Sequence, residues 1–112
     1  MADYRDLIVW QKSMNLVVLV YALTRDFPKE EQFALTSQMR RAAVSVPSNI
    51  AEGSRRRGKD LRHFFVIAYG SASELETQVE LSRRLEYGDF KKHSEVSVLL
   101  LEVLRMLNKM TL

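Results

Sequence analysis

The stretch AAVSVPSNIAEGSRRRGKD, residues 42–60, carries the features that decide the fold. It begins like a helix, contains Pro47 inside the helical pattern, and runs into three consecutive arginines. A proline in a helix interior removes an amide donor and crowds the carbonyl four residues earlier, at a cost of about 3 kcal/mol. We expect a kink near Pro47, because the apolar and polar stripes of this helix both keep their phase through it. The alternative is a break, with Pro47 opening a second short helix.

Outward from this stretch, the chain divides into four helical segments with short connections. Apolar residues recur at intervals of three and four in each segment, which is typical of amphipathic helices. The predicted helices cover residues 6–25, 31–52, 59–87 and 89–109. No segment shows convincing alternation of apolar and polar residues. The sequence therefore predicts an all-α protein, an antiparallel up-down-up-down four-helix bundle with the second helix kinked near Pro47, and a single domain over residues 1–112.

Residues that stop and start helices mark the connections. Pro28 ends the first helical pattern, and residues 29–31 are expected to begin the second helix with acids in its first turn. Gly53 is expected to cap the C-terminus of that helix. Gly88 is a stop signal, and Asp89 is a start signal for the fourth helix.

The composition bounds the class of protein. The chain has 112 residues, of which 46% are hydrophobic and none is cysteine, so it can bury a core but cannot use disulfides or thiolates. The apolar run over residues 14–23 is far shorter than the roughly 20 residues that span a bilayer, and no basic leader precedes it. We expect a cytoplasmic protein that does not enter a membrane. A net charge of +3 is modest, so the clustering of charge is more informative than its total.

The first and fourth helices carry more apolar surface than a small bundle is expected to bury. Residues 16–23 are apolar nearly all round the helix, and Val98 and Leu101 widen the apolar arc of the fourth helix. We expect copies of this chain to cover the surplus by associating. A lone bundle with a few exposed leucines is the alternative. The core is expected to contain most of the aromatic residues that recur at helical spacing, namely Trp10, Tyr21, Phe64, Phe65 and Tyr69.

A polar stripe runs beside the apolar stripe of the second helix. It consists of Gln38, Arg41, Ser45, Asn49 and Glu52. If the second and third helices form a hairpin that turns near Arg56, this stripe faces the third helix, where Glu74 or Glu76 could join it. We interpret Gln38, Arg41, Asn49 and Glu52, joined by Glu74 or Glu76, as a partly buried hydrogen-bonded network that fixes the register of the bundle. A ligand-binding or catalytic site is the alternative.

A basic run follows the second helix. It consists of Arg55, Arg56, Arg57, Lys59 and Arg62. Guanidinium groups suit phosphate because they offer planar, paired donors, so these five residues are the predicted nucleic-acid-binding residues. A solvated surface with no partner is the alternative. The loop contains no aromatic residue on which bases could stack.

No arrangement typical of an enzyme is found. His63 and His93 are the only histidines, and neither has the neighbours that a metal site needs. The segment GSASEL, residues 70–75, lacks the second glycine of a nucleophile elbow and lies inside a predicted helix. We therefore expect neither catalysis nor a metal or other cofactor.

Three stretches carry a resemblance to a known family. They are VWQKSMNLV at residues 9–17, FALTSQMRRAAVSVPSNIAEGS at residues 33–54, and IAYGSASELETQVELSRRL at residues 67–85. Together they resemble the four-helix bundle family of 23S rRNA-intervening-sequence proteins, in the order and spacing of that family. The most specific part is close to the family pattern Ser-Ile-Pro-Ala-Asn-Ile-Ala-Glu-Gly, with Val46 in place of isoleucine and Ser48 in place of alanine.

The resemblance implies a helical, non-enzymatic homo-oligomer, with a pentamer as the expected form. Relatives are encoded within ribosomal RNA genes and are similar to the accessory variability proteins of diversity-generating retroelements. Those proteins form ring-shaped homopentamers and work with a reverse transcriptase and its RNA. Two hypotheses follow: a basic scaffold that binds RNA, DNA or a protein partner such as a reverse transcriptase, or a protein-interaction or purely structural homo-oligomer without a nucleic-acid role.

Overall fold

The computed structural model describes residues 3–112, and its regular structure over that range is helical. The four long helices are α1 (Ile8–Thr24), α2 (Leu35–Ser54), α3 (Gly58–Arg84) and α4 (Phe90–Met110). Two short 3-10 helices, η1 (Tyr4–Asp6) and η2 (Lys29–Glu31), precede α1 and α2. None of the helices in the described range is long and apolar enough to cross a membrane.

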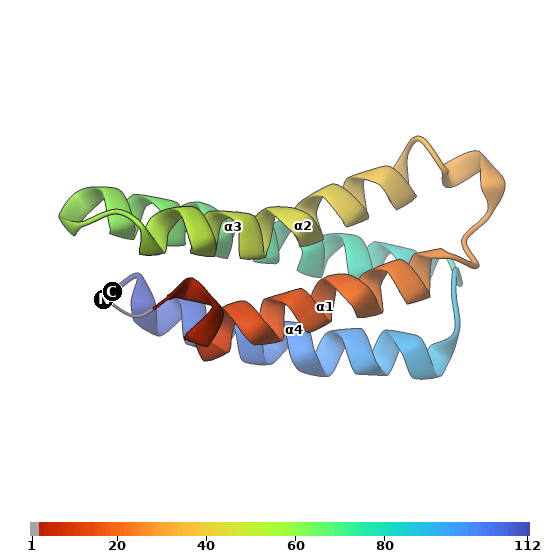
Figure 1. The fold of residues 1–112 in the computed structure, drawn as a ribbon. Helices are drawn as coiled ribbons and strands as arrows, with labels where there is room; N and C mark the ends of the chain where they lie inside the picture. Colours follow the sequence, from red (N-terminus) through yellow and green to blue (C-terminus); the bar gives the residue numbers. More distant parts are fainter. Residues whose placement is uncertain (1–2) are drawn as a thin grey trace.

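Consecutive helices run in opposite directions, which confirms the predicted four-helix bundle (Figure 1). Each helix packs against the next one along the chain, and α4 packs back against α1. The connection between α2 and α3 lies at the same end of the bundle as the first and last described residues. The α1–α2 and α3–α4 connections lie at the opposite end.

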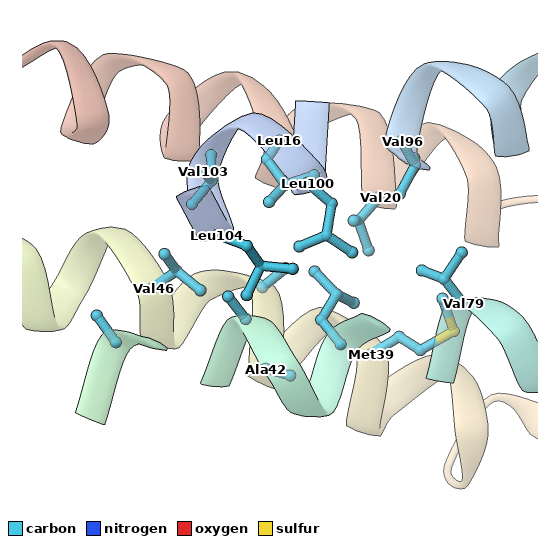
Figure 2. Packing of buried hydrophobic residues seen from close by; sticks show 14 of the residues in the cluster. Leu16, Val20, Met39, Ala42, Val46, Val79, Val96, Leu100, Val103 and Leu104 are labelled. Carbon is cyan, nitrogen blue, oxygen red and sulfur yellow. The ribbon is translucent and has the colours of Figure 1, made fainter. Parts of the chain in front are cut away.

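Aliphatic side chains from all four helices fill the core, where Figure 2 shows them meeting between the helices. Leu16, Met39, Leu75 and Val96 are each fully buried. Residues that repeat every three or four positions along α2 reach this core, as predicted; they are Leu35, Met39, Ala43, Val46 and Ile50. The bundle is therefore held mainly by apolar burial.

The inward face of α1 is the aliphatic one. Leu16, Val20 and Leu23 have no exposed surface, whereas Met14 is 42% exposed and Tyr21 is 39% exposed. The expectation that Tyr21 lies in the core was therefore wrong. Because residues 16–23 are apolar nearly all round, their spacing alone does not determine which arc turns inward.

The ends of α2 differ from those predicted. Residues 29–31 form η2, and α2 begins only at Leu35, whose amide donates to Glu31 Oε1 at 3.3 Å. The Tyr87 hydroxyl donates to Glu31 Oε2 at 3.0 Å, so a contact distant in sequence holds this turn. Gly53 is not a cap, since it lies inside α2 and is buried against Phe65.

Two other predictions about the helices are settled by the backbone. α2 is continuous through the buried Pro47, so the alternative of a break there is wrong; the kink itself stays a prediction. Asp89 caps α4 as predicted, because its carboxylate accepts from the Lys92 amide at 3.0 Å. Gly88, which ends the preceding turn, has a φ of 83° that favours glycine.

Candidate functional site

The basic run forms the tight connection between α2 and α3. Its backbone reverses at Gly58, whose φ is 57° and where a side chain would be strained. The five predicted phosphate-contacting residues are all exposed; they are Arg55, Arg56, Arg57, Lys59 and Arg62. The fold thus gathers them at one end of the bundle, beside the first described residues of the chain.

Two of these five residues have partners within the chain. Arg56 Nη2 lies 2.7 Å from Glu52 Oε1, and its guanidinium lies 5.4 Å from the centre of the Phe64 ring. The hydrogen bond to Glu52, together with its negative charge, raises the pKa of Arg56. The Arg55 guanidinium lies 5.3 Å from the centre of the Tyr4 ring. Exposed ion pairs of this kind contribute little to stability, but they do occupy the donors that would face a ligand.

The other three cations face solvent without an acid partner. Arg57, Lys59 and Arg62 form no ion pair with any residue in the described range. Lys59 and Arg62 line a hollow of about 510 Å³ on the first turns of α3, together with Asp60 and His63. One carboxylate therefore lies among several cations, and the local charge stays positive.

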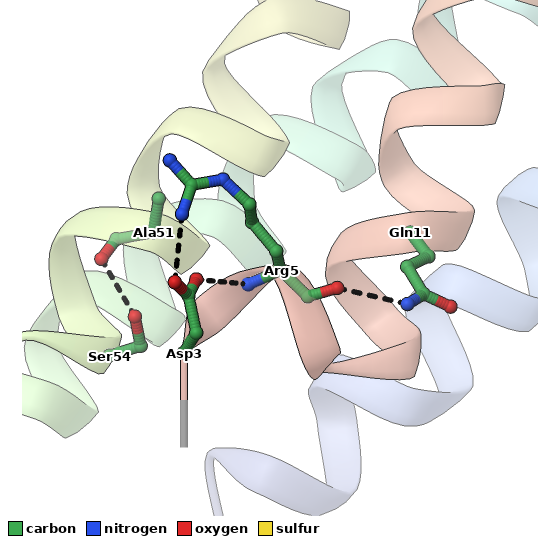
Figure 3. Close-up of polar contacts among 5 residues, drawn as sticks. All are labelled: Asp3, Arg5, Gln11, Ala51 and Ser54. Carbon is green, nitrogen blue, oxygen red and sulfur yellow. Dashed lines mark hydrogen bonds and ion pairs between the residues drawn. The ribbon is translucent and has the colours of Figure 1, made fainter. Parts of the chain in front are cut away.

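An acidic residue from the N-terminal segment also lies at this end. Figure 3 shows Asp3 accepting from the Arg5 amide at 2.9 Å and from its guanidinium at 2.7 Å. The amide hydrogen bond from Arg5 lowers the pKa of Asp3, and the charges of Arg5 and Arg55 act in the same direction. In the same view, Gln11 donates to the Arg5 carbonyl at 2.9 Å and so ties this segment to α1.

Within residues 3–112, no hydrogen bond joins two of the predicted network residues to each other. Ser45 Oγ lies 2.8 Å from Ser71 Oγ and thereby bridges α2 and α3. Asn49 Nδ2 donates to the Ser45 carbonyl at 2.8 Å and to Ser45 Oγ at 3.0 Å. Asn49 thus bonds within its own helix, while Glu52 is engaged by Arg56 in the loop.

The remaining predicted network residues divide between two faces. Gln38, Arg41 and Glu74 line a hollow of about 300 Å³ between α2 and α3. Within the part of the chain that the structure describes, no hydrogen bond joins Gln38 or Arg41 to the serines; Glu74 accepts from Gln78 at 3.4 Å. Glu76 lies elsewhere, in a hollow of about 280 Å³ between α3 and α4.

The site that sequence reasoning missed is the pocket between α1 and α2. It has a volume of about 610 Å³ and lies around Arg40. Arg40 Nε donates to Thr24 Oγ1 at 2.9 Å, and its guanidinium lies 4.5 Å from the centre of the Tyr21 ring. The hydroxyl and the ring hold this guanidinium without bringing a negative charge to it. A sequence signal was present, because Arg40 and Arg41 precede the basic run, but only the fold brings Thr24 and Tyr21 to them.

The two histidines have different environments. His93 is buried, with Nε2 at 2.6 Å from the Tyr87 carbonyl oxygen, whereas His63 is exposed. Among residues 3–112, no group of three or more His, Asp or Glu side chains is arranged to hold a metal ion.

A family model covers nearly the whole of this bundle. The model for 23S rRNA-intervening sequence proteins matches residues 5–109. The chain belongs to this family. In this 23S rRNA-intervening sequence protein, residues 40–53 form most of α2, where Pro47 is buried and Asn49 and Glu52 are half-buried.

A solved structure shows the same fold. It is the crystal structure at 1.70 Å resolution of a Bacteroides thetaiotaomicron VPI-5482 protein of unknown function from the S23 ribosomal protein family. That structure is 23% identical to this chain, with a TM-score of 0.81 over 93% of this chain and 98% of the other. At this identity the likeness shows the fold alone. No curated protein matches this 23S rRNA-intervening sequence protein.

Proposed function

We propose that this chain is a non-enzymatic, self-associating helical bundle whose basic end contacts the phosphates of RNA or DNA. The observation that carries the proposal is the group of three exposed cations, Arg57, Lys59 and Arg62, none of which has an acid partner in the described range. Cations without partners are free to replace the counterions of a nucleic-acid backbone. Such binding is salt-dependent and largely independent of sequence.

Self-association is supported by the outer face of α1. Its exposed positions between the helix ends carry no charge; they are Ile8, Gln11, Met14, Asn15, Val18 and Tyr21. Val18 is 66% exposed, and Val98 on α4 is 63% exposed. A surface helix with an uncharged, partly apolar outer face is typical of an interaction surface.

Association would strengthen the basic end through multivalency. The basic end of one copy offers three cations without a partner in the described range, Arg57, Lys59 and Arg62, and contacts of that number are weak at physiological salt. Several copies, such as the five that the family resemblance implies, would present several loops to one nucleic acid. Such linked weak contacts raise the overall affinity for the nucleic acid, although each copy makes no additional contact.

A gel-shift series in increasing salt, with a structured RNA and a random DNA duplex, tests the nucleic-acid part. Arg57→Ala should reduce the slope of log K against log salt by about 0.9 per copy bound to duplex and about 0.7 for single strands. Arg56→Ala is the matched control because Glu52 already engages Arg56. Unchanged affinity and slope in the triple variant Arg57→Ala, Lys59→Ala, Arg62→Ala would exclude this end as the contact surface.

The alternative is a protein-interaction or purely structural oligomer without a nucleic-acid role. The uncharged outer face of α1 favours association but does not require a nucleic acid. The same gel-shift series separates the two candidates. Native mass measurement of a protein that binds no RNA or DNA but remains assembled would favour the second.

A further inference from the structure

The α1–α2 pocket holds two arginines, Arg40 and Arg41, that form no ion pair within the described range. Arg40 is fixed by Thr24 and Tyr21, and Arg41 is exposed beside it without an ion pair. The other residues that line this pocket are neutral: Tyr21, Gln32, Phe33, Thr36, Ser37, Val44 and Ser45. Arg41 also reaches the α2–α3 hollow that Glu74 lines, but the two residues form no ion pair. Arg40 is half-buried, and charges withdrawn from water are normally paired, so this pocket favours a negatively charged occupant.

The pocket also carries apolar surface at its rim. The Phe33 side chain is 90% exposed and Val44 is 40% exposed. Val44 is shared with a second, mostly apolar hollow of about 250 Å³ that continues between α1 and α2 along Met14 and Trp10. The occupant should therefore present a carboxylate next to apolar side chains, as protein surfaces do, and not a bare chain of phosphates.

The opposite side of the same bundle presents that combination. Because the helices pack in cyclic order, the α3–α4 face lies opposite the α1–α2 face. Its hollow is lined by Glu76, Glu80, Arg83 and Ser97, and Leu101, one turn beyond Ser97, is 44% exposed. Arg83 and Arg84 are paired with Glu80, so of the two carboxylates that line this hollow Glu76 is the one without an ion pair in the described range.

The two surfaces also lie at a similar height along the bundle. Met39, the neighbour of Arg40 in α2, packs in the same layer as Val79, which lies three residues after Glu76 in α3 (Figure 2). A second copy placed side by side in the same orientation would bring its Glu76 to the level of the arginine pocket. No shift along the bundle axis is needed for the charges to meet.

We propose that the α1–α2 pocket is the seat for the α3–α4 face of a second copy, with Glu76 of that copy pairing with Arg41 beside Arg40. The contact is head-to-tail, since a pocket with two arginines and no acid would repel its own counterpart across a two-fold axis. This inference rests on the proposed self-association and names the surfaces that carry it.

A charge swap tests the pairing. Arg41→Glu and Glu76→Arg should each weaken association about tenfold or more, measured by sedimentation velocity over a concentration series. The double variant Arg41→Glu with Glu76→Arg restores opposite charges at every contact and should return to within about threefold of the natural sequence. Lys91 is an exposed lysine without an ion pair in the described range, so Lys91→Glu is the matched control for the change in net charge in Arg41→Glu.

Each outcome decides a separate point. If the natural sequence assembles but neither single variant weakens it, the pocket is not the seat, while the proposed self-association stands. If both single variants dissociate and the double variant does not recover, the two residues are not partners. If the natural sequence is monomeric at all concentrations, self-association itself fails. Circular dichroism of every variant, expected to be unchanged, keeps loss of folding apart from loss of association.

Discussion

Replacing Gly53 by alanine should destabilise the bundle, although alanine is the better helix former. A Cβ at this position would lie 2.9 Å from Phe64 Cβ and 2.9 Å from Phe65 Cδ1, where α2 and α3 approach closely. Alanine gains about 1 kcal/mol of helix propensity over glycine. Overpacking of a buried contact costs about 1–3 kcal/mol. The net expected effect is a loss of about 1 kcal/mol in the free energy of unfolding, or roughly 4 °C in Tm.

Gly70 supplies the matched control in the same bundle. It lies inside α3, it is exposed, and a Cβ built there would meet no atom within 4 Å. Gly70→Ala should therefore keep the gain in helix propensity and raise the stability by about 0.5–1 kcal/mol. Thermal and urea unfolding at equal protein concentration measures both variants. A Gly53→Ala protein as stable as the Gly70→Ala protein would show that the packing of α2 on Phe64 and Phe65 is looser than described.

Three further substitutions probe other parts of the bundle. Gly88→Ala should cost about 2 kcal/mol or more in thermal unfolding, because the φ of 83° is strained for alanine and the Cβ would lie 2.7 Å from Leu23 Cδ1. The hydrogen bond to Glu31 raises the pKa of Tyr87, so its stabilisation is present below about pH 10 and lost as the pH rises through the folded pKa. Titration of phenolate absorbance should lose a component above the ordinary tyrosine pKa in Tyr87→Phe, and an unchanged titration would contradict the contact. Asn49→Leu should broaden the distribution of oligomer sizes more than it changes helicity; a single unaltered size with sharp unfolding would remove Asn49 from the control of assembly.

The number, order and type of the helices could be predicted from the sequence, because their apolar positions recur with helical spacing. The Asp89 cap and the turn at Gly88 were also predictable from local chemistry. The start of α2 was not, because Glu31 is held by Tyr87 from the other end of the sequence. The prediction that Gly53 caps α2 was wrong for a similar reason. A glycine near a helix end is typical of a cap, and its close approach to Phe64 and Phe65 of α3 is not recorded in the local sequence.

The candidate site divides in the same way. The residues of the basic run are close in sequence. Their position together at one exposed end could therefore be predicted once the second and third helices were expected to form a hairpin. The arginine pocket joins Arg40 to Thr24 and Tyr21 across the α1–α2 turn, and no local pattern records that contact. The sequence also does not reveal which arc of α1 faces outward. Both arcs are apolar, so the packing of the other helices determines which one is buried.

The shared location of the chain ends and the basic loop affects how this protein should be handled. Residue 3 and residue 112 lie at the end of the bundle that carries Arg57 (Figure 1). An affinity tag or fluorescent fusion at either terminus would therefore sit beside the surface proposed to meet nucleic acid and could shield it. A circular permutant that joins the present ends by a short linker and opens the chain at the distant α3–α4 turn would move such labels to the far end.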